Sequence, residues 1–357
     1  MRISYCSLLI LHSSFFICHL SFFVVSLFID SMKPKQPPLS DPQLAVFMRR
    51  LNAVAEQNLE LVEAISFYRE TLPLLREAQK NVESFTLNDE TIQNKINSGV
   101  PLLIGEDLPL NVEATRELFL KLCVVVEKVG ASADDQKKKG FSLFSRGKPD
   151  AAKMMDQVST GNDGATRSAA AQQIRHAVEK DQLDLVQVWG ALASGTWSNL
   201  QSLISDLQLD PDLLRVLAQY SLRPSFRAWA EGLHADFDKW QRGLCPMCGN
   251  APSFAEIQGK EGARRLRCSM CGADWAYPRL QCVFCANDNF KSLGYIVVEG
   301  EEEKYNLQTC DECHGYIKTI ATFDPTPVDL ILIEDLATLH LDVSANEKDF
   351  ARIPVRA

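Results

Sequence analysis

The sequence lacks the short motifs that mark the common enzyme classes. It contains no glycine-rich phosphate loop, no Gly-x-Ser-x-Gly nucleophile elbow and no His-Glu-x-x-His signature of zinc hydrolases. No paired carboxylates and no cysteine–histidine dyad stand out as an active centre. The sequence therefore offers no recognisable active centre.

Positive charge does not balance the negative charge. The 357 residues include 37 Lys and Arg against 46 Asp and Glu, which gives a formal net charge of −9. An acidic chain repels phosphate backbones, so general nucleic-acid binding is not expected. One basic strand, with Arg264, Arg265 and Arg267, would offset the charge of a thiolate site, face a partner, or simply be solvated.

One apolar stretch, residues 8–29, is long enough to span a bilayer. It carries only Arg2 as a positive flank and has no Ala-x-Ala-like cleavage site. Met32 then opens a polar segment that is typical of a cytosolic start. We therefore interpret residues 1–31 as an apolar extension that arises from a mis-assigned start. The alternative is a membrane anchor or signal peptide, and membrane association is not expected unless this extension is genuine.

Residues 32–243 are predicted to form a helical domain. Apolar residues recur there at helical spacing, up to about residue 129 and again to about residue 241. Between these runs, residues 131–165 are rich in Ala, Ser, Gly and Lys, which predicts a mobile insertion. Pro224 is expected to end one helix and open another.

From residue 244 onward the pattern changes to short strands and turns. Strand-like patterns lie around Trp275, at 294–298 and at 316–320. The tail is expected to return to helix from Leu336. The fold class is therefore α+β, with a helical N-terminal domain followed by small β modules.

Cysteine is plentiful and concentrated in this second part. Eight of the 11 cysteines form four Cys-x-x-Cys pairs, which on a large chain indicates metal binding in a reducing compartment. Cys6 and Cys18 are isolated, and Cys123 is expected to lie in a helical core. The pairs are Cys245/Cys248, Cys268/Cys271, Cys282/Cys285 and Cys310/Cys313.

A closed tetrahedral site needs four ligands, so two pairs are required for each site. Nineteen residues separate Cys248 from Cys268, which falls in the range of a zinc-ribbon-like module. Twenty-four separate Cys285 from Cys310. We therefore assign the first two pairs to one site and the last two to another, with a pairing of the middle cysteines as the alternative. The two predicted modules are residues 244–281 and 282–357.

A Cys-x-x-Cys turn favours glycine directly after its second cysteine, where φ is positive. Gly249 and Gly272 satisfy this in the first two pairs. The third pair has Ala286 there, followed by Asn287, which tolerates a left-handed turn, and the fourth has its glycine one residue late. His314, next to the last pair, is expected to be an exposed or outer neighbour rather than a ligand.

Four thiolates suit zinc or a single iron, and also some iron–sulfur clusters. Both predicted sites are saturated by their cysteines, with no open position for a substrate or an activated water. This favours a structural or redox role over hydrolysis.

Five blocks in the second half carry a family resemblance. They include the Tyr-Ile-Lys and Asp-Leu-Ala-Thr-Leu pieces, which lie outside any generic metal-binding turn. In order and spacing the blocks resemble the FdhE family of formate dehydrogenase accessory proteins, over about residues 183–345. Residues 1–31 and 131–165 have no counterpart in the family. The blocks are residues 244–252, 265–275, 279–285, 310–318 and 335–342.

The resemblance implies a cytoplasmic protein with two rubredoxin-like modules that bind iron, zinc being the alternative. Such proteins are needed for active formate dehydrogenase and interact with its catalytic subunit, as maturation factors or chaperones without catalysis of their own. The thiolate modules would sense redox state or hold the binding surface. The sequence leaves a homodimer open. Two other functions compete: a rubredoxin-like electron-transfer protein and, less favoured, a zinc-ribbon nucleic-acid binder.

Overall fold

The computed structural model describes residues 42–58, 61–138 and 164–353, without the side chains of 132–138. The chain divides into a short unit, Met1–Ala45, and a main unit, Val46–Ala357, which holds the helical core and the sheet. The apolar stretch at 8–29 and the start predicted at Met32 lie outside the described residues. Within the described ranges, no helix has both the length and the apolar character needed to span a bilayer.

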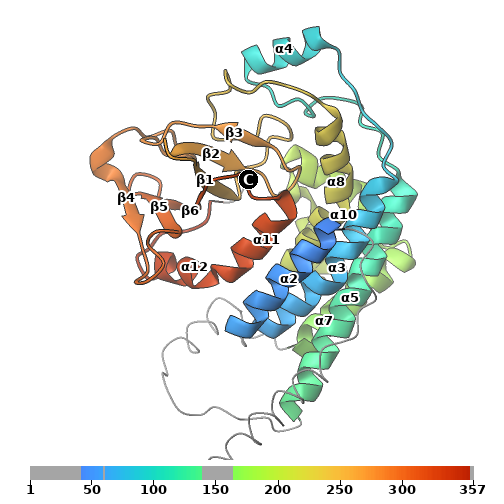
Figure 1. Cartoon of the computed structure of the whole chain (residues 1–357). Helices are drawn as coiled ribbons and strands as arrows, with labels where there is room; N and C mark the ends of the chain where they lie inside the picture. Colours follow the sequence, from blue (N-terminus) through green and yellow to red (C-terminus); the bar gives the residue numbers. More distant parts are fainter. Residues whose placement is uncertain (1–41, 59–60, 139–163, 354–357) are drawn as a thin grey trace, which may run out of the picture. The chain divides into compact units, whose positions relative to one another are not determined.

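The helical part of the main unit packs around one apolar core. Phe119 and Leu122 of the long helix α5 are fully buried there, together with Ile174 of α7 and Leu217 of α10. Cys123 is fully buried in the same core, as its helical pattern predicted. Figure 1 shows α3, α5, α7 and α10 among the helices of this bundle. The helices are α2 (Pro42–Gln57), α3 (Val62–Lys80), α4 (Asp89–Ser98), α5 (Val112–Lys138), α7 (Gly164–Glu179), α8 (Leu185–Ser194), α9 (Gln201–Asp206) and α10 (Pro211–Gly232).

Local sequence explains where several helices begin. The side chain of Asn88 accepts a hydrogen bond from the backbone N–H of Thr91 at the start of α4. Asp210 caps α10 in the same way, with Pro211 in the first turn, where a missing N–H costs nothing. These residues satisfy N–H groups that have no partner within the helix.

Three helix ends differ from the sequence prediction. Helix α5 continues to Lys138, so residues 131–138 are helical rather than part of an insertion, and residues 139–163 lie outside the described residues. The prediction for Pro224 is wrong, because α10 runs through it without a break. An interior proline costs about 3 kcal/mol, and burial of Pro224 and its neighbours in the helical core offsets that cost. Helix α10 ends at Gly232 rather than near residue 241.

The C-terminal part forms one six-stranded sheet in the order β3-β2-β1-β6-β5-β4. Each half is a three-stranded antiparallel unit, and the two halves join where β1 pairs with β6 in parallel. The second unit therefore repeats the strand order of the first along the sheet. The predicted strand patterns coincide with β3, β4 and β6. The strands are β1 (Phe254–Gln258), β2 (Ala263–Arg267), β3 (Asp274–Ala276), β4 (Leu293–Ile296), β5 (Tyr305–Cys310) and β6 (Gly315–Thr322).

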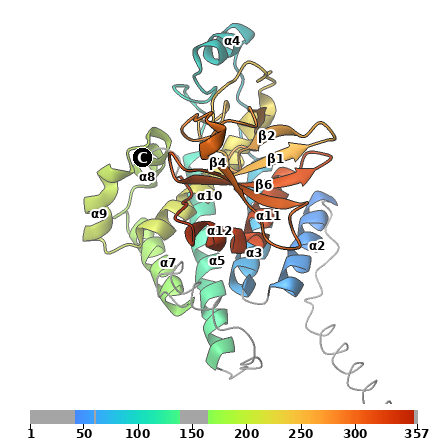
Figure 2. The ribbon, with the colours of Figure 1, turned by 90° about the vertical axis from the view of Figure 1, so that its left-hand side faces the viewer.

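Two C-terminal helices, α11 (Val328–Ala337) and α12 (Leu339–Asn346), pack on one face of the sheet (Figures 1 and 2). Ile331 and Leu341 meet Phe254, Leu307 and Ile320 of the strands in a separate apolar core. Helix thus returns eight residues before the predicted Leu336. The α+β class is confirmed, whereas the domain boundaries at 243/244 and 281/282 stay predictions.

Ion pairs tie α11 to the N-terminal helices. Arg50 of α2 binds Glu334 with its Nε 2.6 Å from Oε1. Arg76 of α3 lies 2.9 Å from Asp329, and Arg227 of α10 pairs with the same carboxylate. Since both carboxylates are almost fully buried, these contacts fix the helical part against the sheet through α11.

Candidate metal centres

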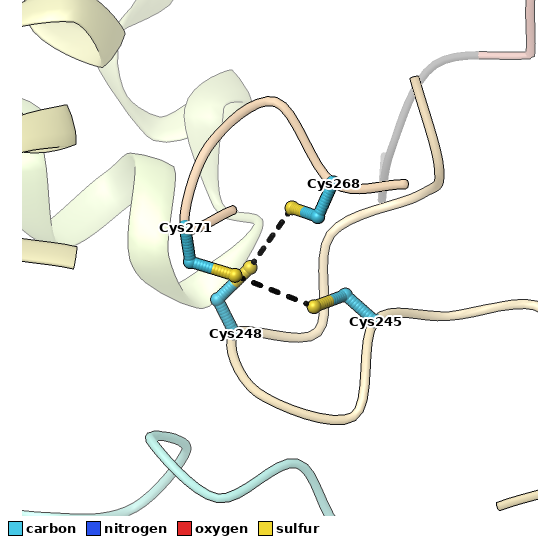
Figure 3. A group of neighbouring side chains, drawn as sticks. All are labelled: Cys245, Cys248, Cys268 and Cys271. Atoms are coloured by element: carbon cyan, nitrogen blue, oxygen red, sulfur yellow. Dashed lines mark hydrogen bonds between the residues drawn. The ribbon is translucent and has the colours of Figure 1, made fainter. Parts of the chain in front are cut away.

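The first two cysteine pairs converge on one point. Cys245 and Cys248 lie in the turn before β1, and Cys268 and Cys271 in the turn between β2 and β3. The sulfur of Cys245 lies 3.5 Å from that of Cys271, and the sulfur of Cys248 lies 3.5 Å from that of Cys268 (Figure 3). All four sulfurs lie within 4.8 Å of one another. We call this group site 1.

Both turns of site 1 are closed by the same backbone bonds. The N–H of Gly249 donates to the carbonyl of Cys245 at 2.9 Å, and the N–H of Gly272 donates to that of Cys268 at 3.0 Å. The two glycines have φ of 77° and 84°, which side chains rarely allow. The predicted reason for a glycine after these pairs is therefore confirmed.

Site 1 is enclosed by the helical part of the chain. All four cysteines are buried, among Trp229, Trp240 and Trp275. The backbone N–H groups of Leu102 and Leu103, from the segment between α4 and α5, donate to carbonyls of the first cysteine turn at 2.8 and 2.9 Å. Site 1 therefore belongs to the packing between the helices and the sheet.

The last two pairs form a second group, site 2. The sulfurs of Cys282 and Cys313 lie 3.6 Å apart, and those of Cys285 and Cys310 lie 3.7 Å apart. These four sulfurs also lie within 4.8 Å of one another. The structure thus brings the eight cysteines together in the two groups of four that their spacing predicted, and not in the alternative pairing.

In both turns of site 2, a residue other than glycine follows the second cysteine. Ala286 has φ of 58° and its N–H donates to the carbonyl of Cys282 at 3.0 Å, so it occupies the position that Gly249 holds in site 1. The residue that takes the left-handed conformation is therefore Ala286, not Asn287. His314, directly after the last pair, is also in the left-handed region, with φ of 51°. It is exposed and lies outside the four-sulfur group.

The two sites differ in exposure. Cys285 is exposed and Cys313 is partly exposed, whereas every cysteine of site 1 is buried. Site 2 is therefore the one that solvent or another molecule can reach directly.

The thiols of each site resist simultaneous ionisation. Burial raises the pKa of Cys245 and Cys271 well above the ordinary value. Hydrogen bonds from Cys245 and the other two sulfurs lower that of Cys268. In site 2, burial raises the pKa of Cys282 to about 11. Since neighbouring thiolates repel one another, a cation is needed for all four to ionise.

Each four-cysteine group could hold a metal ion. A tetrahedral ion with metal–sulfur bonds of about 2.3 Å separates its ligands by about 3.8 Å, close to the observed sulfur spacings. None of the eight cysteines is joined to another in a disulfide bond. Four sulfurs saturate such an ion, so the arrangement offers no open coordination position.

At each site one asparagine side chain donates a hydrogen bond to a cysteine sulfur, a contact that the sequence analysis did not predict. The side-chain amide of Asn250 lies 3.4 Å from the sulfur of Cys248, and that of Asn287 lies 3.5 Å from the sulfur of Cys310. Burial disfavours ionisation of Cys310, but donation from Asn287 and from backbone N–H groups lowers its pKa to about 7. The available signal was the repeated pattern Cys-x-x-Cys-x-Asn in the first and third pairs.

The basic strand β2 is not a solvated face. Arg267 is buried and binds Glu256 at 2.7 Å. Arg264, also buried, reaches across the sheet to Gln308 and to the carbonyl of Gln281, and burial lowers its pKa to about 10. Arg264 lines a pocket beside site 2, although it is adjacent in sequence to the cysteines of site 1.

The comparisons with known proteins point to one family. Residues 244–279 match the description "FdhE, central domain", and residues 280–356 match "FdhE, C-terminal domain". The chain is 36% identical over 161 residues to an FdhE homologue of Aquifex aeolicus, a match that covers 44% of this chain and 54% of that protein. It is 36% identical over 117 residues to a homologue of Shewanella oneidensis, covering 32% and 38% of the two chains. The chain therefore spans about half or less of the length of these two relatives.

The fold is also shared with a solved structure. The crystal structure of the FdhE protein from Pseudomonas aeruginosa superposes with a TM-score of 0.51 at 22% identity, covering 87% of this chain and 92% of the other. At that identity the likeness concerns the fold alone.

Proposed function

Because this chain belongs to the FdhE family, we propose that it is an accessory protein of formate dehydrogenase. In this proposal it binds the catalytic subunit and supports its maturation or activity, without catalysing a reaction itself. The observation that carries the proposal is the pair of four-cysteine groups built into one sheet, one in each of the two segments that match the family. Saturated thiolate sites suit structure or redox sensing better than hydrolysis.

We further propose that both sites hold iron. Four thiolates at these spacings accept zinc as readily, so the donor set supports a metal of this class and the family resemblance favours iron. The clustering of eight cysteines in four Cys-x-x-Cys pairs, which is typical of metal sites, also supports a location in a reducing compartment, the cytoplasm. Metal analysis with a visible spectrum of anaerobically purified protein tests the metal: iron–thiolate absorption is expected, and a colourless protein with two zinc ions would overturn iron.

The accessory function is tested by binding. The full chain, purified without oxygen, is mixed with the isolated catalytic subunit of a formate dehydrogenase, and complex formation is measured by co-purification. We expect a complex with the catalytic subunit and none with an unrelated molybdenum enzyme of similar size. Equal recovery of both, or of neither, contradicts the proposal.

One observation favours a second candidate, electron transfer of the rubredoxin type. Cys285 and Cys313 bring site 2 to the surface, as an electron-transfer centre requires. Rapid reversible oxidation of the metal-loaded protein by redox partners would favour this function over the accessory one. Nucleic-acid binding has no such support, because Arg264 and Arg267 of the basic strand are buried and paired.

A further inference from the structure

The two edges of the sheet are built differently. The edge strand β3 has three residues, and its Asp274 pairs with Arg265 of the neighbouring strand at 2.6 Å. A short, charged edge discourages pairing with another chain. The opposite edge is β4, and no strand of the described residues pairs with its outer side. It lies at the left margin of the sheet in Figure 1 and faces the viewer in Figure 2.

Strand β4 is also short, with four residues, but it lacks the charges and the proline that usually protect an edge. Residues 292–298 carry no charge and no proline, and are rich in residues that favour strands. Tyr295 and Val297 are 55% and 53% exposed and point to the same side of the strand. An uncharged edge with exposed apolar side chains marks a place where another strand can bind.

The backbone of β4 has donors and acceptors available at this edge. The carbonyl of Ser292 accepts from the N–H of Asp311 at 2.9 Å, which fixes the ladder with β5. In an antiparallel ladder such pairs alternate, so Gly294 also bonds toward β5. Leu293 and Tyr295 therefore direct their N–H and C=O groups away from the sheet.

A pocket lies beside this edge. Its volume is about 150 Å³, about the size of a cavity that holds one benzene molecule, and its lining combines apolar side chains with those of Arg264 and Arg279. Leu280, 66% exposed, and Phe290, 68% exposed, stand at this pocket, which adjoins Cys282 and Cys310 of site 2. One apolar side chain of a bound strand would fit here.

The far end of β4 is strongly acidic. Glu299, Glu302 and Glu303 are exposed in the turn that leads to β5. The one basic residue of this turn, Lys304, lies over the ring of Tyr305, 4.7 Å from its centroid. Because the three glutamates are exposed, they would attract a basic side chain on a bound strand.

We propose that β4 is the surface that binds the client, meaning the protein that this chain assists. An extended segment of the formate dehydrogenase catalytic subunit pairs with the outer side of β4, places an apolar side chain in the pocket beside site 2, and directs a basic side chain to the glutamates of the turn. The identity of the client rests on the proposed function. Backbone pairing provides affinity, while the pocket and the acidic turn provide specificity.

The test measures binding of that subunit to variants of the full, metal-loaded chain. Tyr295→Pro removes an outward N–H and is expected to weaken binding at least tenfold. Tyr295→Thr removes the ring but keeps the N–H, and is expected to retain most of the affinity. Ala276→Pro removes an outward N–H from the opposite edge, β3, and is the matched control that should bind like the unaltered chain. The charge reversal Glu302→Lys with Glu303→Lys should weaken binding and reduce its dependence on salt.

If Tyr295→Pro does not fold, hydrogen exchange of the unaltered chain tests whether the client pairs with β4. Bound client should slow exchange at the amides of Leu293 and Tyr295 and leave Ala276 unchanged. If the unaltered chain binds the subunit but these amides are not protected and the proline variant binds equally, the inference about β4 is wrong while the accessory function stands. If the unaltered chain does not bind the subunit, both fall.

Discussion

The buried ammonium of Lys318 lies 3.0 Å from a carboxylate oxygen of Asp335 and joins strand β6 to helix α11. The same ammonium lies 2.5 Å from Asp342 on α12, which also accepts a hydrogen bond from the hydroxyl of Tyr316 at 2.6 Å. Arg352 completes the group by binding both carboxylates. The Tyr-Ile-Lys and Asp-Leu-Ala-Thr-Leu pieces of the family pattern therefore form one charged network that fixes the C-terminal helices to the sheet.

Replacing Lys318 by Met is expected to destabilise the protein by roughly 3 kcal/mol, because the change removes one partner of a buried ion pair. The measurement is urea unfolding of the metal-loaded protein, followed by circular dichroism. Lys348→Met, at an exposed position of the C-terminal segment, is the control and should change stability little. An equal effect of the two substitutions would show that the network does not stabilise the fold.

The same network predicts a dependence of stability on pH. Burial of Asp335 opposes its ionisation, but Lys318 and Arg352 outweigh this and lower its pKa to about 2. A depressed carboxyl pKa stabilises the fold above the unfolded value, about 3.9, and this contribution is lost as the pH falls from about 4 towards 2. Unfolding of the unaltered chain and of Asp335→Asn should therefore differ at pH 6, and the difference should shrink steadily below pH 4 and largely vanish at about pH 2. A difference that is constant over this range contradicts the assigned role.

The grouping of the cysteines and the burial of Cys123 could be predicted from the sequence, because both depend on patterns within a short segment. The grouping of the cysteines follows from spacing, since each Cys-x-x-Cys turn brings two sulfurs together and a connection of nineteen residues allows one hairpin. The position of Cys123 followed from helical periodicity. In each case the signal lay in the residues of a single element.

What could not be predicted depends on contacts between distant segments. The parallel pairing of β1 with β6, which merges two modules into one sheet, leaves no local pattern. The position of Arg264 could not be predicted either, because its side chain reaches Gln308 on β5, 44 residues away in the sequence. The prediction for Pro224 was wrong because packing around α10 outweighs the local cost of an interior proline.

Ala286 offers a test of backbone strain at site 2. An L-residue in the left-handed region costs about 1 kcal/mol or more, and glycine removes that cost. Ala286→Gly is therefore expected to raise the stability of the metal-loaded protein by about 0.5–1 kcal/mol. The matched control is Ala273→Gly, directly after the glycine of the second turn, where φ is not positive. That change should destabilise the protein, and a gain at both positions would rule out the explanation by backbone strain.

Removal of metal should separate the two sites, because only site 2 reaches the surface. With a chelator in excess, metal is expected to leave in two phases, the faster one from the site that contains Cys285 and Cys313.

Cys285→Ser should abolish the fast phase and reduce the metal content from two ions to one, with modest loss of helical stability. Cys245→Ser should remove the slow phase and destabilise the helices as well, because the first cysteine turn is hydrogen-bonded to Leu102 and Leu103. Metal binding contributes folding free energy on the order of 10 kcal/mol at such sites, so this loss should be plain in thermal unfolding. A single phase of metal release, or equal damage from the two substitutions, would show that burial does not distinguish the sites.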